Sequence, residues 1–248
     1  MRIAALYDIH GNLPALEAVL DEIRSARVDE IIVGGDVLPG PMPSESLALL
    51  FDLDIPARFL MGNGDRETLA QRNGVESSAI PAAFREAIRW VAAQLSPEHA
   101  RLISAWPATQ RAHVGTLGSV LFCHATPRND TDIFTRLTPD DRVAPAFAGV
   151  DSDVVVCGHT HMQFDRHVGP LRVVNAGSVG MPFGEPGAYW LLLGDYIELR
   201  HTGYDLVRAA ERIAATHYPQ AAEFAAGNVL RPPPEAQMLE AFRKMELK

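Results

Sequence analysis

Short apolar runs, each followed by polar residues, recur along much of the chain. Apolar runs of about four to eight residues bounded by turn residues are typical of buried strands. The segment after the first run instead repeats leucine and isoleucine at helical spacing, with Asn12 as a candidate N-cap and Pro14 in the first turn. The pattern therefore predicts strand, loop and helix units of an α/β fold. We expect strands at residues 3–7, 30–33, 57–61, 119–123 and 153–157 and a helix at about 44–50.

A long helical pattern interrupts this alternation at about residues 67–106. Trp90 and Trp106 are expected to pack in the core, because large aromatic side chains are mostly buried. One stripe of apolar side chains at helical spacing is expected to face the core: Phe84, Ile88, Val91 and Leu95.

Beyond Gly158 the pattern changes to hairpins. Residues 163–168 turn through Gly169-Pro170 into 171–175, and residues 190–193 turn through Gly194-Asp195 into 196–200. Helical spacing resumes at Leu206, and the prolines at 232–234 precede a last charged helix that we expect at the surface. We therefore expect a single domain over residues 1–248, with a helical insertion at about 67–106 and a C-terminal helical tail at about 205–248.

Composition and charge narrow the class of protein. A chain of 248 residues with 47% hydrophobic residues can bury a substantial core. No apolar stretch approaches the roughly 18 residues needed to span a bilayer, and no signal-peptide pattern precedes the first strand, so we expect a cytoplasmic protein. The net charge of −9 argues against a broad grip on nucleic acid but is compatible with a nucleotide. Cys123 and Cys157 each end an apolar run and are expected to be buried free thiols.

Polar residues with metal-binding side chains follow the carboxyl ends of the predicted strands, where α/β sheets bind ligands. In extended backbone, positions two apart face the same way, so Asp8 and His10 could meet one ion together, and His159 and His161 are likewise spaced to face the same way. Imidazoles and carboxylates without thiolates suit Mn, Fe, Zn, Ni or Co. Seven candidates exceed the needs of one ion, which predicts two ions sharing a bridging carboxylate such as Asp36. The candidates are Asp8, His10, Asp36, Asn63, His124, His159 and His161.

These residues occur in ordered blocks that resemble those of the calcineurin-like metallophosphoesterases, and most closely the small bacterial and archaeal phosphodiesterases. The resemblance implies a four-layer α/β/β/α sandwich of the metallo-dependent phosphatase type. The blocks are Asp8-Ile9-His10-Gly11-Asn12, Gly35-Asp36, Gly62-Asn63-Gly64-Asp65, His124, Gly158-His159-Thr160-His161 and Asn175-Ala176-Gly177-Ser178-Val179-Gly180.

The resemblance also implies a division of roles. Asp8, His10 and His161 would bind the first ion, and Asn63, His124 and His159 the second, with Asp36 bridging them. A hydroxide held between the two ions would attack phosphorus in line, without a covalent enzyme intermediate. The implied catalytic residues are Asp8, His10, Asp36, Asn63 and His124. The expected substrate is a small phosphoester, which Asn63 and Arg128 would contact.

Gly64 departs from the family pattern, in which many relatives have a histidine able to protonate the leaving group. General acid catalysis contributes roughly a hundred- to ten-thousand-fold in rate, so we expect good turnover only with acidic leaving groups. Asp65 is expected to orient a ligand imidazole such as His10, because metal-binding histidines usually have such a partner.

For two arginines a functional and a structural interpretation stay open, whereas Ser178 and five histidines are given a surface or structural role. The guanidinium groups of Arg128 and Arg66 could hold phosphate oxygens or be solvated at the surface. Ser178 lacks a general base at a recognisable spacing, so we expect it to support a tight turn rather than act as a nucleophile. Five histidines fall outside every motif and are expected to have surface or structural roles: His99, His113, His167, His201 and His217.

The leading hypothesis is a dinuclear metal-dependent phosphodiesterase. A phosphomonoesterase or a dinucleoside polyphosphate hydrolase would use the same chemistry and stays open. A non-catalytic protein-binding scaffold on the same fold is the alternative of another class, although all seven ligand positions hold competent residues. The natural substrate, the metal and the oligomeric state are not determined by the sequence.

Overall fold

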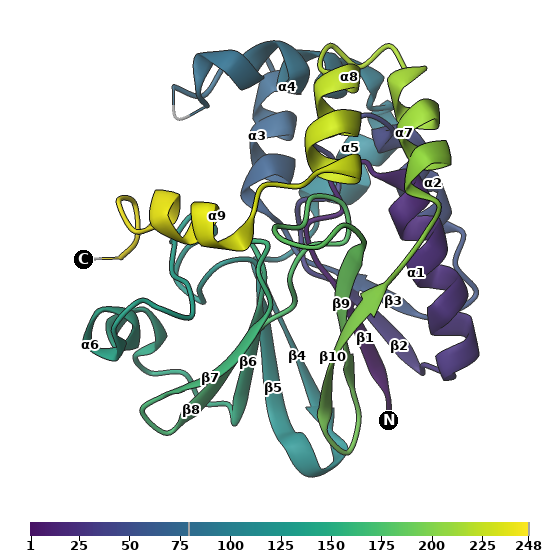
Figure 1. The fold of residues 1–248 in the computed structure, drawn as a ribbon. Helices are drawn as coiled ribbons and strands as arrows, with labels where there is room; N and C mark the ends of the chain where they lie inside the picture. The colour runs from purple at the N-terminus through teal and green to yellow at the C-terminus, as the bar shows by residue number, and fades with distance from the viewer. Residues whose placement is uncertain (79, 248) are drawn as a thin grey trace.

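The computed structural model describes residues 1–78 and 80–247 (Figure 1). Residue 79, within the expected helical insertion, and residue 248, at the end of the expected tail, lie outside the described residues. The strands within this part are β1 (Ile3–Leu6), β2 (Glu30–Val33), β3 (Ala57–Phe59), β4 (Thr109–Val114), β5 (Gly118–Cys123), β6 (Val154–Cys157), β7 (Phe164–Val168), β8 (Leu171–Asn175), β9 (Ala188–Leu193) and β10 (Ile197–Thr202).

The α-helices alternate with the first strands and then gather near the end of the chain (Figure 1). They are α1 (Leu13–Ala26), α2 (Pro43–Phe51), α3 (Asn63–Arg72), α4 (Ala82–Gln94), α5 (Pro97–Ser104), α6 (Asp140–Val143), α7 (Leu206–Ala214), α8 (Ala221–Phe224) and α9 (Glu235–Phe242). Short 3-10 helices cover Gly115–Leu117 and Ala144–Phe147, and a π-helix covers Ala225–Leu230.

The described strands form two five-stranded sheets. The first has the order β10-β9-β1-β2-β3, with β1, β2 and β3 parallel and β9 antiparallel to β1. The second has the order β4-β5-β6-β8-β7, with β5, β6 and β8 parallel and the hairpin partners β4 and β7 antiparallel at its edges. The two hairpins expected beyond Gly158 are confirmed as β7–β8 and β9–β10.

The two sheets pack face to face around a buried apolar layer. On β1, Ile3 and Ala5 face the second sheet, whereas Ala4 and Leu6 face the helices. Both faces of this central strand are therefore buried, which explains its continuous apolar run. The outer face of the second sheet is covered by α6 and the 3-10 helix after it. This arrangement confirms the expected four-layer α/β/β/α sandwich.

Local signals in the sequence account for the first helix. The Asn12 side-chain oxygen accepts a hydrogen bond from the Ala15 N–H at 3.2 Å, as expected for an N-cap. The same amide donates to the Gly180 carbonyl at 2.9 Å. Asn12 therefore starts α1 and ties the loop after β1 to the loop before β9.

The helical segment at 67–106 is three helices, α3, α4 and α5, rather than one continuous stripe. Ile88, Val91 and Leu95 are buried as expected, but Phe84 is 53% exposed. The reason is that Phe84 lies in the first turn of α4, which projects beyond the sheet (Figure 1). Trp106 stacks on Phe59 with ring centroids 5.0 Å apart, and Trp90 packs against Tyr218, so both tryptophans pack as expected.

Strand β4 was not expected from the sequence. Its residues, Thr-Gln-Arg-Ala-His-Val, carry no apolar run, because an edge strand paired only with β5 exposes much of its length.

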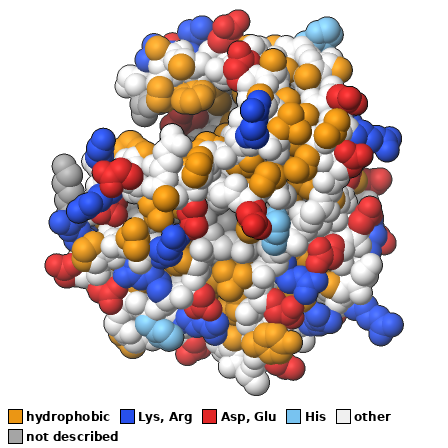
Figure 2. All heavy atoms as spheres, in the orientation of Figure 1, with side chains coloured by type: hydrophobic (Ala, Val, Ile, Leu, Met, Phe, Trp, Pro, Cys, Tyr) orange, Lys and Arg blue, Asp and Glu red, His pale blue; other side chains and the backbone are white. Residues whose placement is uncertain are grey.

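Both cysteines are buried and free, as expected. Among the described residues, no helix combines the length and the apolar character needed to cross a membrane. Figure 2 shows one face of the molecule, on which acidic and basic side chains are interspersed.

Candidate metal centre

The seven candidate ligands lie at the carboxyl-terminal edge of the two sheets. The loops after β1, β2, β5 and β6 supply all of them except Asn63, which is the first residue of α3. The parallel strands of each sheet place these loops side by side (Figure 1). Residues separated by up to about 150 positions in the chain thus come together as two groups.

The first group contains Asp8, His10 and His161. The Asp8 Oδ1 atom lies 3.4 Å from His161 Nε2 and 3.9 Å from His10 Nε2. The two ring nitrogens are 3.1 Å apart. Ligand atoms of all three residues lie within 4.8 Å of one another, close enough to bind one ion together.

The second group contains Asn63, His124 and His159. The Asn63 side-chain oxygen lies 3.1 Å from His124 Nε2, and the two imidazole rings pack with centroids 5.1 Å apart. If the amide is turned, its nitrogen donates to His124 Nε2 and His159 Nδ1, each at 3.1 Å. With the oxygen inward, three electron-pair donors face one another, which is the arrangement that a cation stabilises.

Asp36 lies between the two groups. Its Oδ1 atom is 3.7 Å from His124 Nε2, and its Oδ2 atom is 3.9 Å from His10 Nε2. Asp8 also reaches both sides, since its Oδ1 atom is 3.9 Å from His124 Nε2. Each group therefore has a carboxylate oxygen within reach of its imidazoles.

An orphaned oxygen supports the fit of a cation. Asp8 is fully buried, and its Oδ2 atom accepts from the His159 N–H at 2.8 Å, but Oδ1 has no hydrogen-bond partner among the described residues. A buried carboxylate oxygen without a partner is costly unless a proton or a metal satisfies it. Because imidazole lone pairs surround this oxygen, the donor set fits a divalent cation.

Backbone carbonyls fix the orientation of three ligand imidazoles. A ring nitrogen that donates its proton to a carbonyl leaves the other nitrogen with a free lone pair. In all three cases Nδ1 faces the carbonyl and Nε2 faces the site. The pairs are His10 with Pro39 at 3.1 Å, His124 with Gly34 at 2.9 Å and His161 with Met181 at 2.7 Å.

Asp65 does not orient an imidazole, so the expectation that it would position His10 is wrong. Its Oδ1 atom accepts from the N–H groups of Val37 and Leu38 at 3.0 Å each, and its Oδ2 atom accepts from that of Gly62 at 3.3 Å. As the third residue of α3, it reaches back to the backbone before the helix. Asp65 thus holds the loop after Asp36 against the start of α3. Burial and the charge of Asp36 raise the pKa of Asp65 to about 7, against the effect of the N–H donors.

Left-handed backbone is concentrated at the ligands. Six of the described residues other than glycine have positive φ, from 49° to 66°. Arg27 at the end of α1 is one, and the other five are candidate ligands: Asp8, His10, Asp36, His159 and His161. Such a conformation costs roughly 1–2 kcal/mol for an L-residue, and outliers of this kind cluster at functional sites.

This backbone corrects the geometric argument for the paired ligands. Asp8 and His10 do meet in the first group, but through left-handed turns and not through the alternation of extended backbone. His159 and His161 diverge, because His161 faces Asp8 whereas His159 faces Asn63 and His124. Before both pairs the strand ends two residues ahead of the first ligand, at Leu6 and at Cys157, so the extended pattern does not reach the ligands.

Burial and neighbouring charges set the protonation states of Asp8 and His159 near neutral pH. Burial alone would raise the pKa of Asp8, but the neighbouring His161, His124 and His10 outweigh it and hold the pKa below its usual value. Burial, reinforced by His124, lowers the pKa of His159 to about 4. Asp8 is therefore ionised and His159 neutral at pH 7, which are the forms that bind metals.

Both candidate phosphate-binding arginines are paired with a carboxylate. Arg128 donates from Nε to Asp132 at 2.7 Å, with half of its side chain exposed. Arg66 donates to both oxygens of Asp130, at 2.7 and 3.0 Å. The Asp130 carbonyl lies 3.2 Å from the Asn63 amide, so Arg66 is linked to the second group through Asp130.

Ser178 supports a turn, as expected. Its hydroxyl donates to the Asp8 carbonyl at 2.7 Å and accepts from the Met181 N–H at 2.8 Å.

Phe183, which the sequence did not single out, stacks on His161 with ring centroids 5.2 Å apart. In the described part of the chain, the ligand groups include none of the five histidines outside the motifs, namely His99, His113, His167, His201 and His217.

The space beside Gly64 is filled. A Cβ atom on Gly64 would lie 2.3 Å from Pro39 Cγ and 3.0 Å from Asp36 Oδ1. The Gly64 N–H donates to Asp36 Oδ1 at 2.7 Å. The ring of Pro39 therefore occupies the place where a side chain at position 64 would begin.

Comparisons with known proteins show the family and the fold of the chain. A model of the calcineurin-like phosphoesterase superfamily domain matches residues 1–194. Over 238 residues the chain is 28% identical to an uncharacterized protein of Methanocaldococcus jannaschii, which covers 88% of this chain and 94% of that protein.

Two solved structures are similar along nearly their whole length. A metallophosphoesterase from Sphaerobacter thermophilus is 25% identical, with a TM-score of 0.71 over 92% of this chain and 99% of the other. A hypothetical protein from Pyrococcus horikoshii is 18% identical, with a TM-score of 0.77 over 90% and 97% of the two chains, and shows the same fold.

Proposed function

Since the chain belongs to the calcineurin-like phosphoesterase superfamily and is a metal-dependent phosphoric ester hydrolase, we propose that it is a phosphodiesterase that uses two metal ions. The observation that carries this proposal is the convergence of seven candidate ligand side chains. Asp8 and Asp36 lie together with His124 as well as with the imidazole of His10, and Asn63 and His159 lie beside His124. One ion of four to six ligands would leave one to three of these seven donors without a partner.

The proposed ligand assignment follows the two groups. Asp8, His10 and His161 hold the first divalent ion; Asn63, His124 and His159 hold the second. Asp36 bridges them, which its two oxygens support by facing opposite groups. Two ions bound in this way supply an activated water and neutralise phosphoryl oxygens. Mn, Fe, Zn, Ni and Co all suit these ligands.

The protein's own part in catalysis is to hold these groups in place. Carbonyl acceptors keep the imidazole protons on Nδ1, and Asp65 fixes the loop that carries Asp36. Ser178 fixes the backbone of Asp8 from the opposite side. Preorganised ligands of this kind lower the cost of ordering the site when substrate binds.

The proposal is tested by metal analysis together with hydrolysis of bis(4-nitrophenyl) phosphate. We expect two ions per chain after reconstitution with Mn and hydrolysis that Asp36→Asn reduces by at least about a hundredfold, because the bridge loses its charge. His113→Asn, on the edge strand β4, is the matched control and should hydrolyse the diester normally. Fewer than one ion per chain with no hydrolysis would instead favour a non-catalytic scaffold.

A further inference from the structure

A cavity of about 360 Å³ opens beside the first ligand group. One of its walls is His161, a proposed ligand of the first ion. Its other walls come from the rest of the loop between β6 and β7, from the loop before β9, from β9 itself and from the first residue of α9. The side chains that matter for its chemistry are His161, Gln163, Phe183, Glu185, Tyr189 and Glu235.

Two aromatic rings of this cavity are fixed in place. Phe183 stacks on His161 and packs against Phe242 of α9, with ring centroids 5.2 and 6.0 Å apart. Tyr189 stacks on His201 at 4.4 Å, and its hydroxyl donates to the Glu185 carbonyl at 3.1 Å. Fixed rings next to a reaction centre form a surface for a substrate group of defined shape.

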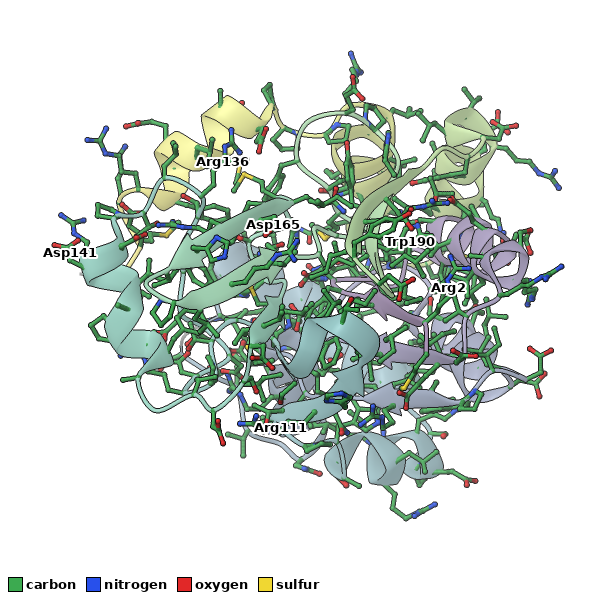
Figure 3. All side chains as sticks on the ribbon, turned by 90° about the horizontal axis from the view of Figure 1, so that it is seen from below. Arg2, Arg111, Arg136, Asp141, Asp165 and Trp190 are labelled. Atoms are coloured by element: carbon green, nitrogen blue, oxygen red, sulfur yellow. The ribbon has the colours of Figure 1, made fainter. Side chains whose placement is uncertain are left out.

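The charge of the cavity is negative. Its lining contains two carboxylates, Glu185 and Glu235, and neither lysine nor arginine among the described residues. Glu235 is paired with Arg136, which Figure 3 shows beside α9. Glu185 makes no ion pair with any residue that the structure describes, and its side chain is exposed to the cavity and to solvent. Burial and the charges of Glu185 and Glu235 raise the pKa of Tyr189, consistent with a negative potential around its hydroxyl.

Aromatic faces and a free carboxylate together favour a cation. A cation over an aromatic ring gains roughly 0.5–2 kcal/mol, and a carboxylate nearby adds to this attraction. A second phosphate group in the cavity would be repelled by the Glu185 carboxylate, and the lining has no arginine or lysine that could pair with it. The lining thus distinguishes between classes of phosphodiester.

We propose that this cavity is the subsite for one ester group of the substrate, and that this group is a positively charged amino alcohol. The proposal rests on the proposed phosphodiesterase activity and deepens it. Phe183 and Tyr189 supply the aromatic walls and Glu185 the counter-charge. Dinucleoside polyphosphates are disfavoured, because they carry further negative charges.

A matched pair of substrates tests this inference. The first is 4-nitrophenyl phosphocholine, and the second is 4-nitrophenyl 3,3-dimethylbutyl phosphate, which has the same shape without the positive charge. In both, water attacks phosphorus, the bond to the nitrophenyl oxygen breaks, nitrophenolate leaves and the two protons of the water are released. The leaving group is identical, so a difference in kcat/KM reports only the retained group.

We expect the manganese-loaded protein to have a kcat/KM about tenfold higher for the choline ester. Glu185→Gln should bring the ratio of the two values close to one. Glu223→Gln, an exposed residue of α8 that changes the net charge equally, should keep the tenfold ratio. A ratio near one in the unmodified protein, or a ratio that Glu185→Gln leaves at tenfold, overturns the inference.

The outcomes separate this inference from the proposed function. Hydrolysis of bis(4-nitrophenyl) phosphate without a preference for the choline ester would overturn the subsite and keep the phosphodiesterase. Absence of all diester hydrolysis would overturn the phosphodiesterase, and calorimetry would then decide on the subsite. The manganese-loaded protein should bind phosphocholine about tenfold more tightly than 3,3-dimethylbutyl phosphate, and equal affinities would overturn the inference.

Discussion

At the scale of single residues, the ligands depend on an uncommon backbone conformation. His10 has φ of 49°, a region that glycine adopts without strain and that an alanine does not. Replacing His10 by glycine or by alanine removes the imidazole in both variants. A difference in stability between the two metal-free variants therefore reports the backbone conformation at position 10.

We expect His10→Gly to be more stable than His10→Ala by about 1 kcal/mol, measured by urea unfolding of the metal-free protein. At His113, in the regular strand β4, the order should be reversed, since glycine in a strand costs roughly 0.5–1 kcal/mol relative to alanine. The same order at both positions would contradict the left-handed conformation of His10.

Position 64 bears on the choice of substrate. Gly64 provides no proton donor, and Pro39 fills the adjacent space. We expect the rate to depend steeply on the acidity of the leaving group, because no side chain there can protonate a poor one. A nitrophenyl methyl phosphate should be hydrolysed at least about a hundredfold faster than a dialkyl phosphate, measured as kcat/KM. Equal rates would show that another group supplies the proton.

At this scale the sequence indicated which seven side chains the structure brings together, but not their backbone geometry. Polar residues directly after apolar strands indicated all seven, because the carboxyl ends of parallel strands meet at one edge. The left-handed turns were not predictable, since Asp and His adopt them only where tertiary contacts compensate the strain. Asp65 was assigned to the wrong partner for a similar reason: its role as a backbone acceptor depends on where α3 begins.

At the scale of secondary structure elements, α9 is linked to the ligands through aromatic rings. Phe242 packs on Phe183, which in turn stacks on His161. The Gly184 N–H also donates to the Pro233 carbonyl at 2.9 Å, so the segment before α9 holds the same loop.

We expect Phe242→Ala to weaken manganese binding at the first site severalfold, because Phe183 loses the ring that holds it against His161. Calorimetric titration of the metal-free protein measures this affinity. Met245→Ala, which is 57% exposed at the end of the same segment, should bind manganese normally. Unchanged affinity in Phe242→Ala would show that Phe183 keeps its position without α9.

Most elements could be predicted from the sequence, and the exceptions have physical causes. Buried strands and amphipathic helices leave clear patterns, so β1, β2, β5, β6 and α1 were expected. Strand β4 leaves none, because its exposed edge position tolerates polar residues. The cavity beside His161 could not be predicted from the sequence either. Glu185 and Glu235 lie 50 positions apart in the chain and come to line one cavity only when α9 folds back (Figure 1).

At the scale of the whole molecule, the helical segment before β4 packs against the C-terminal helices through Tyr218. Its ring contacts Trp90 of α4 and Phe224 of α8, with centroids 5.6 and 6.3 Å apart. Burial raises the pKa of Tyr218 to about 12. Because the folded protein keeps this proton more tightly than the unfolded chain, the resulting stabilisation is complete below pH 10 and is lost as the pH rises to 12.

We expect the free energy of unfolding to fall more steeply between pH 10 and 12 in the unmodified protein than in Tyr218→Phe. At about 1.4 kcal/mol per unit of pKa shift, the extra loss in the unmodified protein reaches up to about 3 kcal/mol at pH 12. Tyr196→Phe, at a tyrosine that is 66% exposed, should retain the steep dependence. Denaturant unfolding at each pH measures the difference. Parallel curves for the unmodified protein and Tyr218→Phe would contradict the raised pKa.

The position of β1 between β2 and β9 has a consequence for synthesis on the ribosome. The strand that precedes Asp8 is translated about 180 residues before its second neighbour in the sheet, which spans residues 188–193. Until β9 has been translated, one edge of β1 therefore lacks its partner, and non-local pairing of this kind is slow to form. The nascent chain is exposed to aggregation until β9 emerges, so conditions that slow translation late in the chain should lower the yield of folded protein.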